Sequence, residues 1–378
     1  MSATTYPNYS PGLEGVVAGV STISQIDAPR SSLTYRGIDV HDLAEKGSFE
    51  ETSYLLLHGK LPNAAQLSEF KKTLGEEREV PAAIYDVLRA LPKNTHPMDM
   101  IRTAYSALAP FDPDYTRNDH DANMRKAIRI IAKAGTMVAN GHRIRKGLDI
   151  VKPDPSLSTA GNFLYILNGT KADEYTEKVM DASLTLYAEH GFNASTFANR
   201  VTVSTLSDLY SGVVTGIGTL RGPLHGGANE EAMHMILEIG EPSNAEKWIR
   251  DALANKKKVM GFGHREYKNG DSRAFYMTKQ AKDIGRRMGN TKYGDIADIL
   301  EKVMLEEKNL YPNVDFPAAY AYYLLGIPID LYTPIFVIAR VSGYTAHAIE
   351  QLDNNRIIRP TVIYEGLNNV PFIPISER

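Results

Sequence analysis

The sequence predicts an all-α protein, with a large helical domain and a smaller inserted domain that closes over it by a hinge. Three observations carry this prediction. Segments with helical periodicity and capping signals follow one another along most of the 378 residues. Alternating, β-branched sequence is confined to Val16–Thr34, where a short hairpin is expected. The chain is long enough to bury a large core and to form two domains.

Capping residues bound the elements expected in the first half of the chain. Asp39 is placed to cap a helix that stops at Gly47. Asn63 and Gln66 have the spacing of a capping box for a helix that ends at Gly75. Further helices are expected over Glu50–Leu57, Ala82–Leu91, Pro97–Leu108, Asp121–Ala139 and Asp173–Glu189.

The second half is also predicted to be helical. Ser195–Thr219 is apolar on most sides, which predicts one buried central helix. Asn229 is placed to cap the next helix, and Ser243 with Glu246 to cap the one after it. The remaining helices are expected over Ser272–Met288, Tyr293–Lys308, Phe316–Leu325 and Leu331–Leu352, the last of them in the core or at a subunit interface.

Glycine-rich sequence bounds the smaller inserted domain, which is predicted to span residues 223–326. Residues 1–222 and 327–378 are predicted to form the large helical domain. This division places the chemically distinctive turns described below on the part of the chain that would move.

Composition excludes several classes of protein. The chain carries 42 basic and 45 acidic residues, so no basic excess favours nucleic acid. It has no cysteine, which rules out disulfides and thiolate chemistry. No apolar run is long enough for a membrane span, Met1–Gly12 lacks a signal pattern, and no residue spacing indicates a metal site. A cytoplasmic enzyme is expected.

Three turns bounded by glycine or proline each carry a titratable side chain. They are Gly222-Pro-Leu-His225-Gly-Gly-Ala-Asn229, Gly261-Phe-Gly-His264-Arg265 and Asn313-Val-Asp315-Phe-Pro317. One carboxylate and two imidazoles suit proton abstraction beside a carbonyl, because the carboxylate can accept the proton while the imidazoles donate to oxygens that become negative. The set therefore indicates an active site.

Each of these side chains also has a structural explanation. His225 lies just before a predicted helix, whose N-terminus would keep the imidazole neutral, but it could also be a plain turn histidine. Apolar neighbours would raise the basicity of Asp315. Its position before Pro317 equally fits a helix N-cap, and on its own this turn favours the cap.

Positive charge precedes and follows the glycine turn at 261–263. Lys256–Lys258, Arg265 and Lys268 could hold the phosphates of a cofactor, with backbone groups of the turn contacting its base. A solvated helix end is the alternative for the lysines.

Arginines supply candidate anion clamps, namely Arg273, Arg340 and Arg359. Arg340 lies in an apolar helix and needs a partner, which would be a dicarboxylate substrate or a salt bridge to Glu350 or Asp353. His190 is expected on a tight corner between two helices, and His347 is expected to be structural.

The three turns, in this order, resemble the citrate synthase family. The likeness runs from about Gly12 to the C-terminus and includes Leu33-Thr-Tyr-Arg-Gly37, Asn193-Ala-Ser-Thr196 and Ile357-Ile-Arg-Pro360. Glu350-Gln351 and the segment Asp353–Pro360 look more like the 2-methylcitrate synthase branch. Asp271-Ser272-Arg273 departs from the Asp-Pro-Arg that many family members carry.

The resemblance implies a homodimeric transferase that binds oxaloacetate, closes, and condenses it with acetyl-CoA or propionyl-CoA to give citrate or 2-methylcitrate. It assigns the base to Asp315, the donor to the enol oxygen to His225 and the donor to the oxaloacetate carbonyl to His264, which overrides the cap explanation of Asp315. Oxaloacetate ligands would be His190, Arg273, Arg340 and Arg359, the last reaching into the partner's site. Coenzyme A contacts would be Lys257, Lys258, Val259, Met260, Gly261, Phe262 and Gly263.

The acyl-CoA would be a co-substrate, with no permanently bound cofactor. The implied pathways are the tricarboxylic acid cycle and propionate catabolism through methylcitrate. One methylene separates the two acyl groups and is worth only about 1–3 kcal/mol, so an enzyme of dual capacity is expected. Two alternatives remain at this point: a lyase that cleaves a citryl-CoA-like thioester, and a regulatory CoA-binding protein with a degenerate site.

Overall fold

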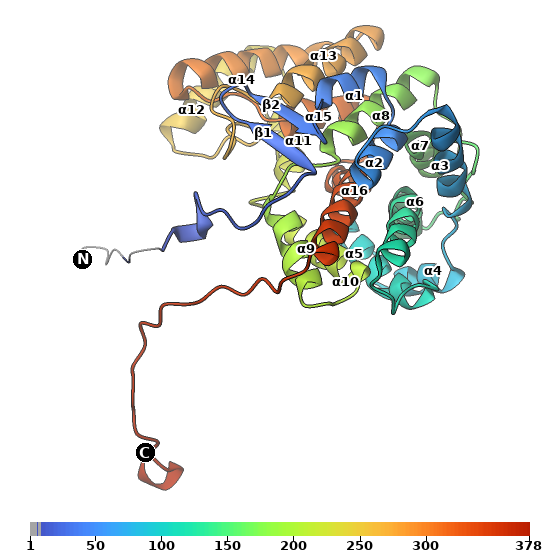
Figure 1. The fold of residues 1–378 in the computed structure, drawn as a ribbon. Helices are drawn as coiled ribbons and strands as arrows, with labels where there is room; N and C mark the ends of the chain where they lie inside the picture. Colours follow the sequence, from blue (N-terminus) through green and yellow to red (C-terminus); the bar gives the residue numbers. More distant parts are fainter. Residues whose placement is uncertain (1–5, 7–8) are drawn as a thin grey trace.

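The computed structural model describes residue 6 and residues 9–378. Residues 1–5 and 7–8 lie outside the described part of the chain. Within the described part, 61% of the structure is helix and 3% is strand. Helices cover almost the whole molecule (Figure 1). The all-α prediction is confirmed.

The predicted N-terminal hairpin is present with narrower bounds and an added edge strand. β1 (Ser24–Asp27), β2 (Ser32–Tyr35) and β3 (Ile38–Asp39) form one antiparallel sheet in the order β1-β2-β3. Ile26 pairs with Leu33, which sets the register of the hairpin. The hydroxyl of buried Tyr35 donates to the backbone oxygen of Glu189 at 3.0 Å, so the sheet lies against the turn that follows α8.

The helices of the first half largely match expectation. Asp39 caps α1, and Asn63 with Gln66 forms the predicted capping box of α3. One helix was not predicted, α7, which Ser158 caps and which is buried on most sides. The bounds are α1 (Val40–Lys46), α2 (Phe49–His58), α3 (Ala64–Glu76), α4 (Ala82–Ala90), α5 (Pro97–Leu108), α6 (His120–Arg145), α7 (Thr159–Asn168) and α8 (Glu174–Tyr187).

The second half contains α9 (Ala194–Ser204), α10 (Leu209–Leu220), α11 (Ala228–Ile239), α12 (Pro242–Ala254), α13 (Ser272–Arg287), α14 (Lys292–Lys308), α15 (Asp315–Leu324) and α16 (Tyr332–Asp353). Short 3-10 turns lie at Pro11–Leu13, Ala109–Phe111, Ile329–Leu331 and Ile375–Glu377.

Three boundary predictions in this half are wrong. Ser195–Thr219 is two helices rather than one, because Leu206 adopts a positive φ and Asp208 caps α10 by accepting from the N–H of Ser211. α11 begins at Ala228 with Gly227 as its N-cap, so Asn229 lies inside the helix. α12 begins at Pro242, because proline fits the first helical position, and the predicted Ser243 cap is absent.

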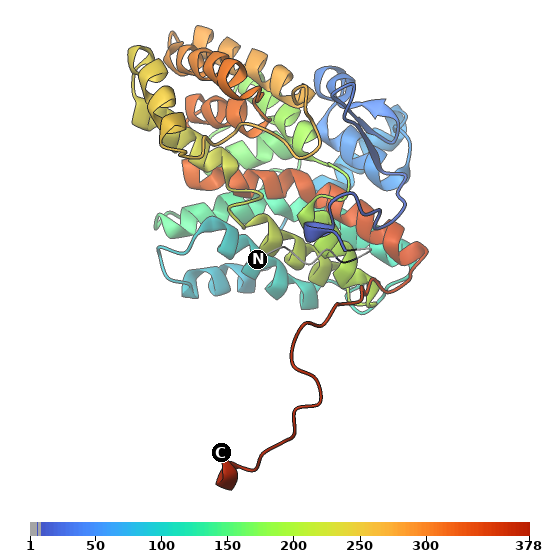
Figure 2. The ribbon, with the colours of Figure 1, turned by 90° about the vertical axis from the view of Figure 1, so that its left-hand side faces the viewer.

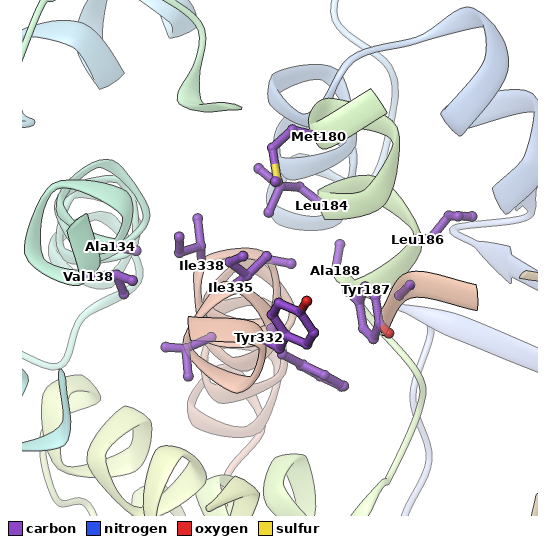
Figure 3. Packing of buried hydrophobic residues seen from close by; sticks show 14 of the residues in the cluster. Ala134, Val138, Met180, Leu184, Leu186, Tyr187, Ala188, Tyr332, Ile335 and Ile338 are labelled. Carbon is purple, nitrogen blue, oxygen red and sulfur yellow. The ribbon is translucent and has the colours of Figure 1, made fainter. Parts of the chain in front are cut away.

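The last long helix, α16, is the centre of the core. Figure 3 shows Ile335 and Ile338 of α16 between α6, marked by Ala134 and Val138, and α8, marked by Leu184. All five of these side chains are buried. The helix also carries Arg340 and His347 into the interior, so it positions charged groups as well as apolar ones.

Helices α11–α15 gather at one end of the molecule in both views (Figures 1 and 2). α13 and α11 both pack on α15, and α12 packs on α14. The division into domains at 223 and 326 remains a prediction. α16 ends at Asp353, and the next residues still contact α9, because Asn355 Nδ2 and Ile358 N–H both donate to Ser204 at 3.0 Å. Beyond this contact the chain leaves the body as an extended tail (Figure 1). Among the described residues, no helix has the length and hydrophobicity that crossing a bilayer would require.

Candidate active site

His190 lies on the tight corner that the sequence predicts. α8 ends at Tyr187, and Asn193 caps α9 by accepting from the N–H of Thr196. The imidazole is buried, and its Nε2 lies 3.1 Å from the hydroxyl of Tyr267. The corner therefore points His190 at the loop that follows α12.

That loop carries His264, whose ring centre is 5.1 Å from the ring centre of His190. The backbone N–H groups of Glu266 and Tyr267 both donate to His264 Nδ1, at 3.1 and 3.3 Å. Because Nδ1 accepts these bonds, the ring proton of the neutral imidazole resides on Nε2. His264 can thus offer Nε2–H to a substrate oxygen.

His225 is held on the other side by Ser195, whose Oγ lies 2.7 Å from His225 Nε2. The ring of Phe336 is 6.4 Å away, in an edge-on arrangement. Helix α11 begins three residues after His225. The Ser195 hydroxyl itself donates to Asn193 Oδ1 at 2.8 Å, so it accepts from His225 Nε2–H, and Nδ1 carries no proton in this arrangement.

All three imidazoles are uncharged at neutral pH. Burial, reinforced by Arg340, lowers the pKa of His225 to about 4. Burial and then Arg273 lower the pKa of His264 to about 4, and the same causes bring the pKa of His190 well below its usual value. The predicted neutrality of His225 agrees with these shifts, but its main cause is burial rather than the neighbouring helix N-terminus.

Asp315 is the first residue of α15, and Val314 occupies the N-cap position. The explanation of Asp315 as a helix cap is therefore wrong. Its Oδ1 accepts a hydrogen bond from the hydroxyl of Tyr187 at 2.8 Å. Burial raises the pKa of Asp315 to about 6, and the bond from Tyr187 partly opposes this rise. The carboxylate is ionised at pH 7 and more basic than an ordinary aspartate.

The glycine turn and the segment before Asp315 are joined by backbone bonds. Asn313 N–H donates to Gly261 O at 2.9 Å, and Gly263 N–H donates to Tyr311 O at 2.8 Å. Gly261 has a φ of +82°, and a Cβ there would lie 2.7 Å from Cβ of Phe316. Glycine is required at this position, and the His264 loop is hydrogen-bonded to the segment that leads into α15.

Arg340 is a buried cation with no carboxylate partner. Its side chain is 1% exposed, and its Nε donates to the backbone oxygen of Tyr187 at 2.9 Å. Within the described part of the chain, no acidic oxygen lies within 4.0 Å of its guanidinium. Glu350 pairs with Arg200 and Asp353 with His120, so the predicted alternative of a salt bridge to either residue is wrong. A buried unpaired guanidinium is typical of an anion site.

Arg273 differs from Arg340, because Asp271 already binds it. Nε and Nη2 of Arg273 donate to the two oxygens of Asp271 at 3.0 and 2.8 Å. Burial alone would raise the pKa of Asp271, but the charge and hydrogen bonds of Arg273 overcome this effect and lower it. In the described residues Nη1 of Arg273 has no hydrogen-bond partner, so one edge of the guanidinium is available to an anion.

The remaining predicted site residues lie on the C-terminal tail and on the loop that precedes His264. Arg359 is exposed on the C-terminal tail. Lys257 donates to Glu238 at 3.2 Å and lies over the ring of Trp248, and Lys258 is exposed. Of the predicted coenzyme A contacts, Val259 is buried, and Met260, Phe262 and Gly263 are partly exposed beside the cluster.

Sequence reasoning assigned no role to several residues that contact the predicted site. Tyr187 binds Asp315, Tyr267 binds His190, Ser195 binds His225 and Asp271 binds Arg273. Only Asp271 had a usable signal, because an aspartate two residues before an arginine at a helix start can both cap the helix and pair with the arginine.

Comparisons with known proteins show which family the chain resembles. The family model described as "Citrate synthase, C-terminal domain" matches residues 12–361. Citrate synthase 2 of Bacillus subtilis (strain 168) is 48% identical over 97% of this chain and 98% of its own length. 2-Methylcitrate synthase 2 of Corynebacterium glutamicum is 44% identical, with the full length of both chains covered.

Solved structures show the same fold. Citrate synthase from Pyrobaculum aerophilum superposes with a TM-score of 0.92 at 38% identity, covering 97% of this chain and 95% of that one. A ternary complex of citrate synthase from Thermoplasma acidophilum with carboxymethyl coenzyme A and oxaloacetate gives a TM-score of 0.93 at 34% identity, covering 98% and 99%. The chain belongs to the citrate synthase family. It is an enzyme of the citrate synthase and 2-methylcitrate synthase type.

Proposed function

We propose that this enzyme condenses oxaloacetate with a short acyl-CoA, acetyl-CoA or propionyl-CoA, and hydrolyses the resulting thioester to citrate or 2-methylcitrate plus CoA. The observation that carries the proposal is the grouping of Asp315, whose pKa is raised, with imidazoles whose pKa values are lowered, beside the unpaired Arg340. A base, two neutral donors and an anion clamp are the groups that this reaction requires.

Asp315 is proposed to remove a proton from the α-carbon of the acyl thioester. His225 donates a hydrogen bond to the thioester oxygen as it gains enol character, so the electrons of the broken C–H bond have a stabilised destination. Neutral imidazoles suit this role better than charged ones, because their proton affinity is closer to that of an enol. Ser195 orients the His225 ring through Nε2, and donation from Nδ1 requires Ser195 to turn its hydroxyl from Asn193 to Nε2.

His264 is proposed to donate its Nε2–H to the ketone oxygen of oxaloacetate, which makes the carbonyl carbon more electrophilic. Arg340 and the free edge of Arg273 would bind the two carboxylates, and His190 would hold the substrate between them. The enol carbon then attacks the carbonyl carbon, and water cleaves the citryl-type thioester to release CoA as a thiol. Thioester hydrolysis makes the overall reaction favourable.

We further propose a homodimer in which Arg359 enters the partner's site. Arg359 lies on the C-terminal tail that follows α16, and it is exposed in the single chain. The tail exposes large apolar side chains, which a monomer would leave in water: Val362, Leu367, Val370, Phe372 and Ile375. Burial of these residues on a second copy would remove this cost and deliver Arg359 at the same time.

Coenzyme A is proposed to bind as a co-substrate along residues 257–263. The backbone hydrogen bonds that join Gly261 and Gly263 to the segment before Asp315 support this placement. Through these bonds, a ligand that orders the loop would also fix the position of the base. The acyl preference decides whether the enzyme serves the tricarboxylic acid cycle, propionate catabolism through methylcitrate, or both. One methylene in an apolar pocket is worth about 1–3 kcal/mol, so activity with both substrates is expected.

Thiol release tests the proposal. The purified protein is mixed with oxaloacetate, either acyl-CoA and a chromogenic thiol reagent, and kcat/KM is compared for the two acyl groups. Condensation predicts thiol release that needs both substrates and a product identified as citrate or 2-methylcitrate by mass spectrometry. Binding of both ligands with no thiol released would contradict the proposal and favour a regulatory role.

A further inference from the structure

A buried chain of polar side chains ends at the corner that carries His190. Glu189 is fully buried, and its Oε1 accepts from Gly191 N–H at 2.5 Å, from Ser24 Oγ at 3.0 Å and from His347 Nε2 at 2.8 Å. These bonds close a ring around His190, because Glu189 and Gly191 are its two neighbours in sequence. The corner is therefore fixed by one carboxylate.

His347 is oriented by a group that can only donate. Arg200 Nη1 lies 3.1 Å from His347 Nδ1, and an arginine has no acceptor, so Nδ1 accepts and the ring proton resides on Nε2. Nε2–H then donates to Glu189. Arg200 is held in turn by Glu350, at 2.8 Å. The order Glu350, Arg200, His347, Glu189 thus fixes both the tautomer and the direction of each bond.

The same face of α16 also holds the corner by close packing. Arg340 Nε donates to Tyr187 O, and His347 lies two turns further along the helix. Gly343 lies between them, and a Cβ there would be 2.5 Å from the backbone oxygen of Ala188. Residues 340, 343 and 347 therefore lie on one face of α16, and this face packs against the chain from Tyr187 to Glu189.

We infer that His347 is a positioning residue for oxaloacetate, acting through Glu189 on His190. The inference rests on the proposed function for the identity of the substrate. His347 lies beyond the substrate, since Glu189 separates it from His190, and it would not touch the acyl-CoA. Loss of its bond to Glu189 frees a buried carboxylate to move and lets the corner shift, and displacements of about 1 Å can reduce activity about 100-fold.

The test compares His347→Leu, which removes the donor, with His347→Gln, whose amide can donate to Glu189 and accept from Arg200. Asp353→Asn is the control, because it alters the exposed His120 contact at the end of the same helix. His347→Leu is expected to raise the KM for oxaloacetate about 10- to 100-fold and leave the KM for acyl-CoA within about 2-fold. His347→Gln is expected to keep the KM for oxaloacetate close to the wild-type value. Asp353→Asn is expected to change neither KM.

Equal increases in both KM values for His347→Leu, or no increase in either, would overturn the inference. Hydrogen exchange of the segment 188–193 in the substrate-free protein provides a second measurement. The exchange rate of this segment should rise in His347→Leu and stay close to the wild-type rate in His347→Gln. This measurement does not depend on turnover. If the wild-type protein released no thiol, the proposed function would fail, and unchanged exchange would still separately refute the positioning role.

Discussion

The hydroxyl of Tyr187 donates a 2.8 Å hydrogen bond to Oδ1 of Asp315, while its backbone oxygen accepts from Nε of Arg340 at 2.9 Å. One residue at the end of α8 thus connects the proposed base on α15 with the proposed anion clamp on α16. Its ring packs 4.6 Å from that of Phe336, which also lies beside the Arg340 guanidinium. The proton affinity of the base therefore depends on the side chain of Tyr187, and the position of the clamp depends on the backbone of the same residue.

Tyr187→Phe is expected to move the acid limb of activity to higher pH. Activity requires ionised Asp315, so kcat/KM of the wild type should fall as pH drops through about 6. The Tyr187 bond favours the charged carboxylate, and its loss raises the pKa further. A hydrogen bond to a charged group is worth about 1.5–3 kcal/mol, which gives a shift of about 1–2 pH units. The pH dependence of thiol release measures it.

Tyr105→Phe is the matched control, because this buried tyrosine loses a similar bond, to Ile130 O at 2.7 Å, away from the site. Its acid limb should coincide with that of the wild type. An unshifted acid limb in Tyr187→Phe would mean that Asp315 is not the group whose ionisation controls activity.

Ser195→Ala is expected to lower kcat while binding of oxaloacetate is retained. Loss of the hydroxyl at 2.7 Å removes the hydrogen bond that orients the His225 ring. Loss of one oriented donor to a developing oxyanion costs about 100- to 1000-fold in kcat. Steady-state kinetics with oxaloacetate titrations separate kcat from binding. The exposed Ser156→Ala serves as the control, and a Ser195→Ala enzyme with wild-type kcat would show that His225 needs no such support.

Arg340→Met is expected to separate stability from binding. The buried guanidinium has no carboxylate within 4.0 Å among the described residues, so an apolar side chain of similar length removes the cost of desolvating a charge. The substrate-free variant should therefore melt at the same temperature as the wild type or higher. Oxaloacetate should raise the melting temperature of the wild type only. Equal ligand-induced shifts in both proteins would remove Arg340 from the binding site.

The sequence was sufficient for the helical class and for the polar residues of the turns, because capping residues and glycine turns are local signals. It could not identify Tyr187, which has the sequence context of an ordinary core residue at the end of a helix until the fold brings its hydroxyl to Asp315. The cap explanation of Asp315 was attractive for the same reason, since the pattern of one turn cannot show a partner 128 residues away. Helix α7 was not predicted although a local signal was present, since Ser158 is of a good capping type and caps the helix.

Asp315→Asn is expected to abolish turnover and stabilise the fold. Loss of the base should reduce kcat by about 100- to 10,000-fold. The folded-state pKa of Asp315 is raised from 3.8 to about 6, so the folded protein binds the proton more tightly than the unfolded chain. The free energy of unfolding therefore falls as pH rises from about 4 to about 6, and the full penalty, about 1–3 kcal/mol, is present above pH 6. Asparagine keeps the acceptor for Tyr187 and carries no charge, so it removes this penalty.

Urea unfolding at pH 4 and pH 8 measures the effect. The free energy of unfolding of Asp315→Asn should exceed that of the wild type at pH 8 only, and the exposed Asp121→Asn should show no such pH-dependent gain. A variant that is less stable than the wild type at pH 8 would mean that the fold needs this carboxylate charged.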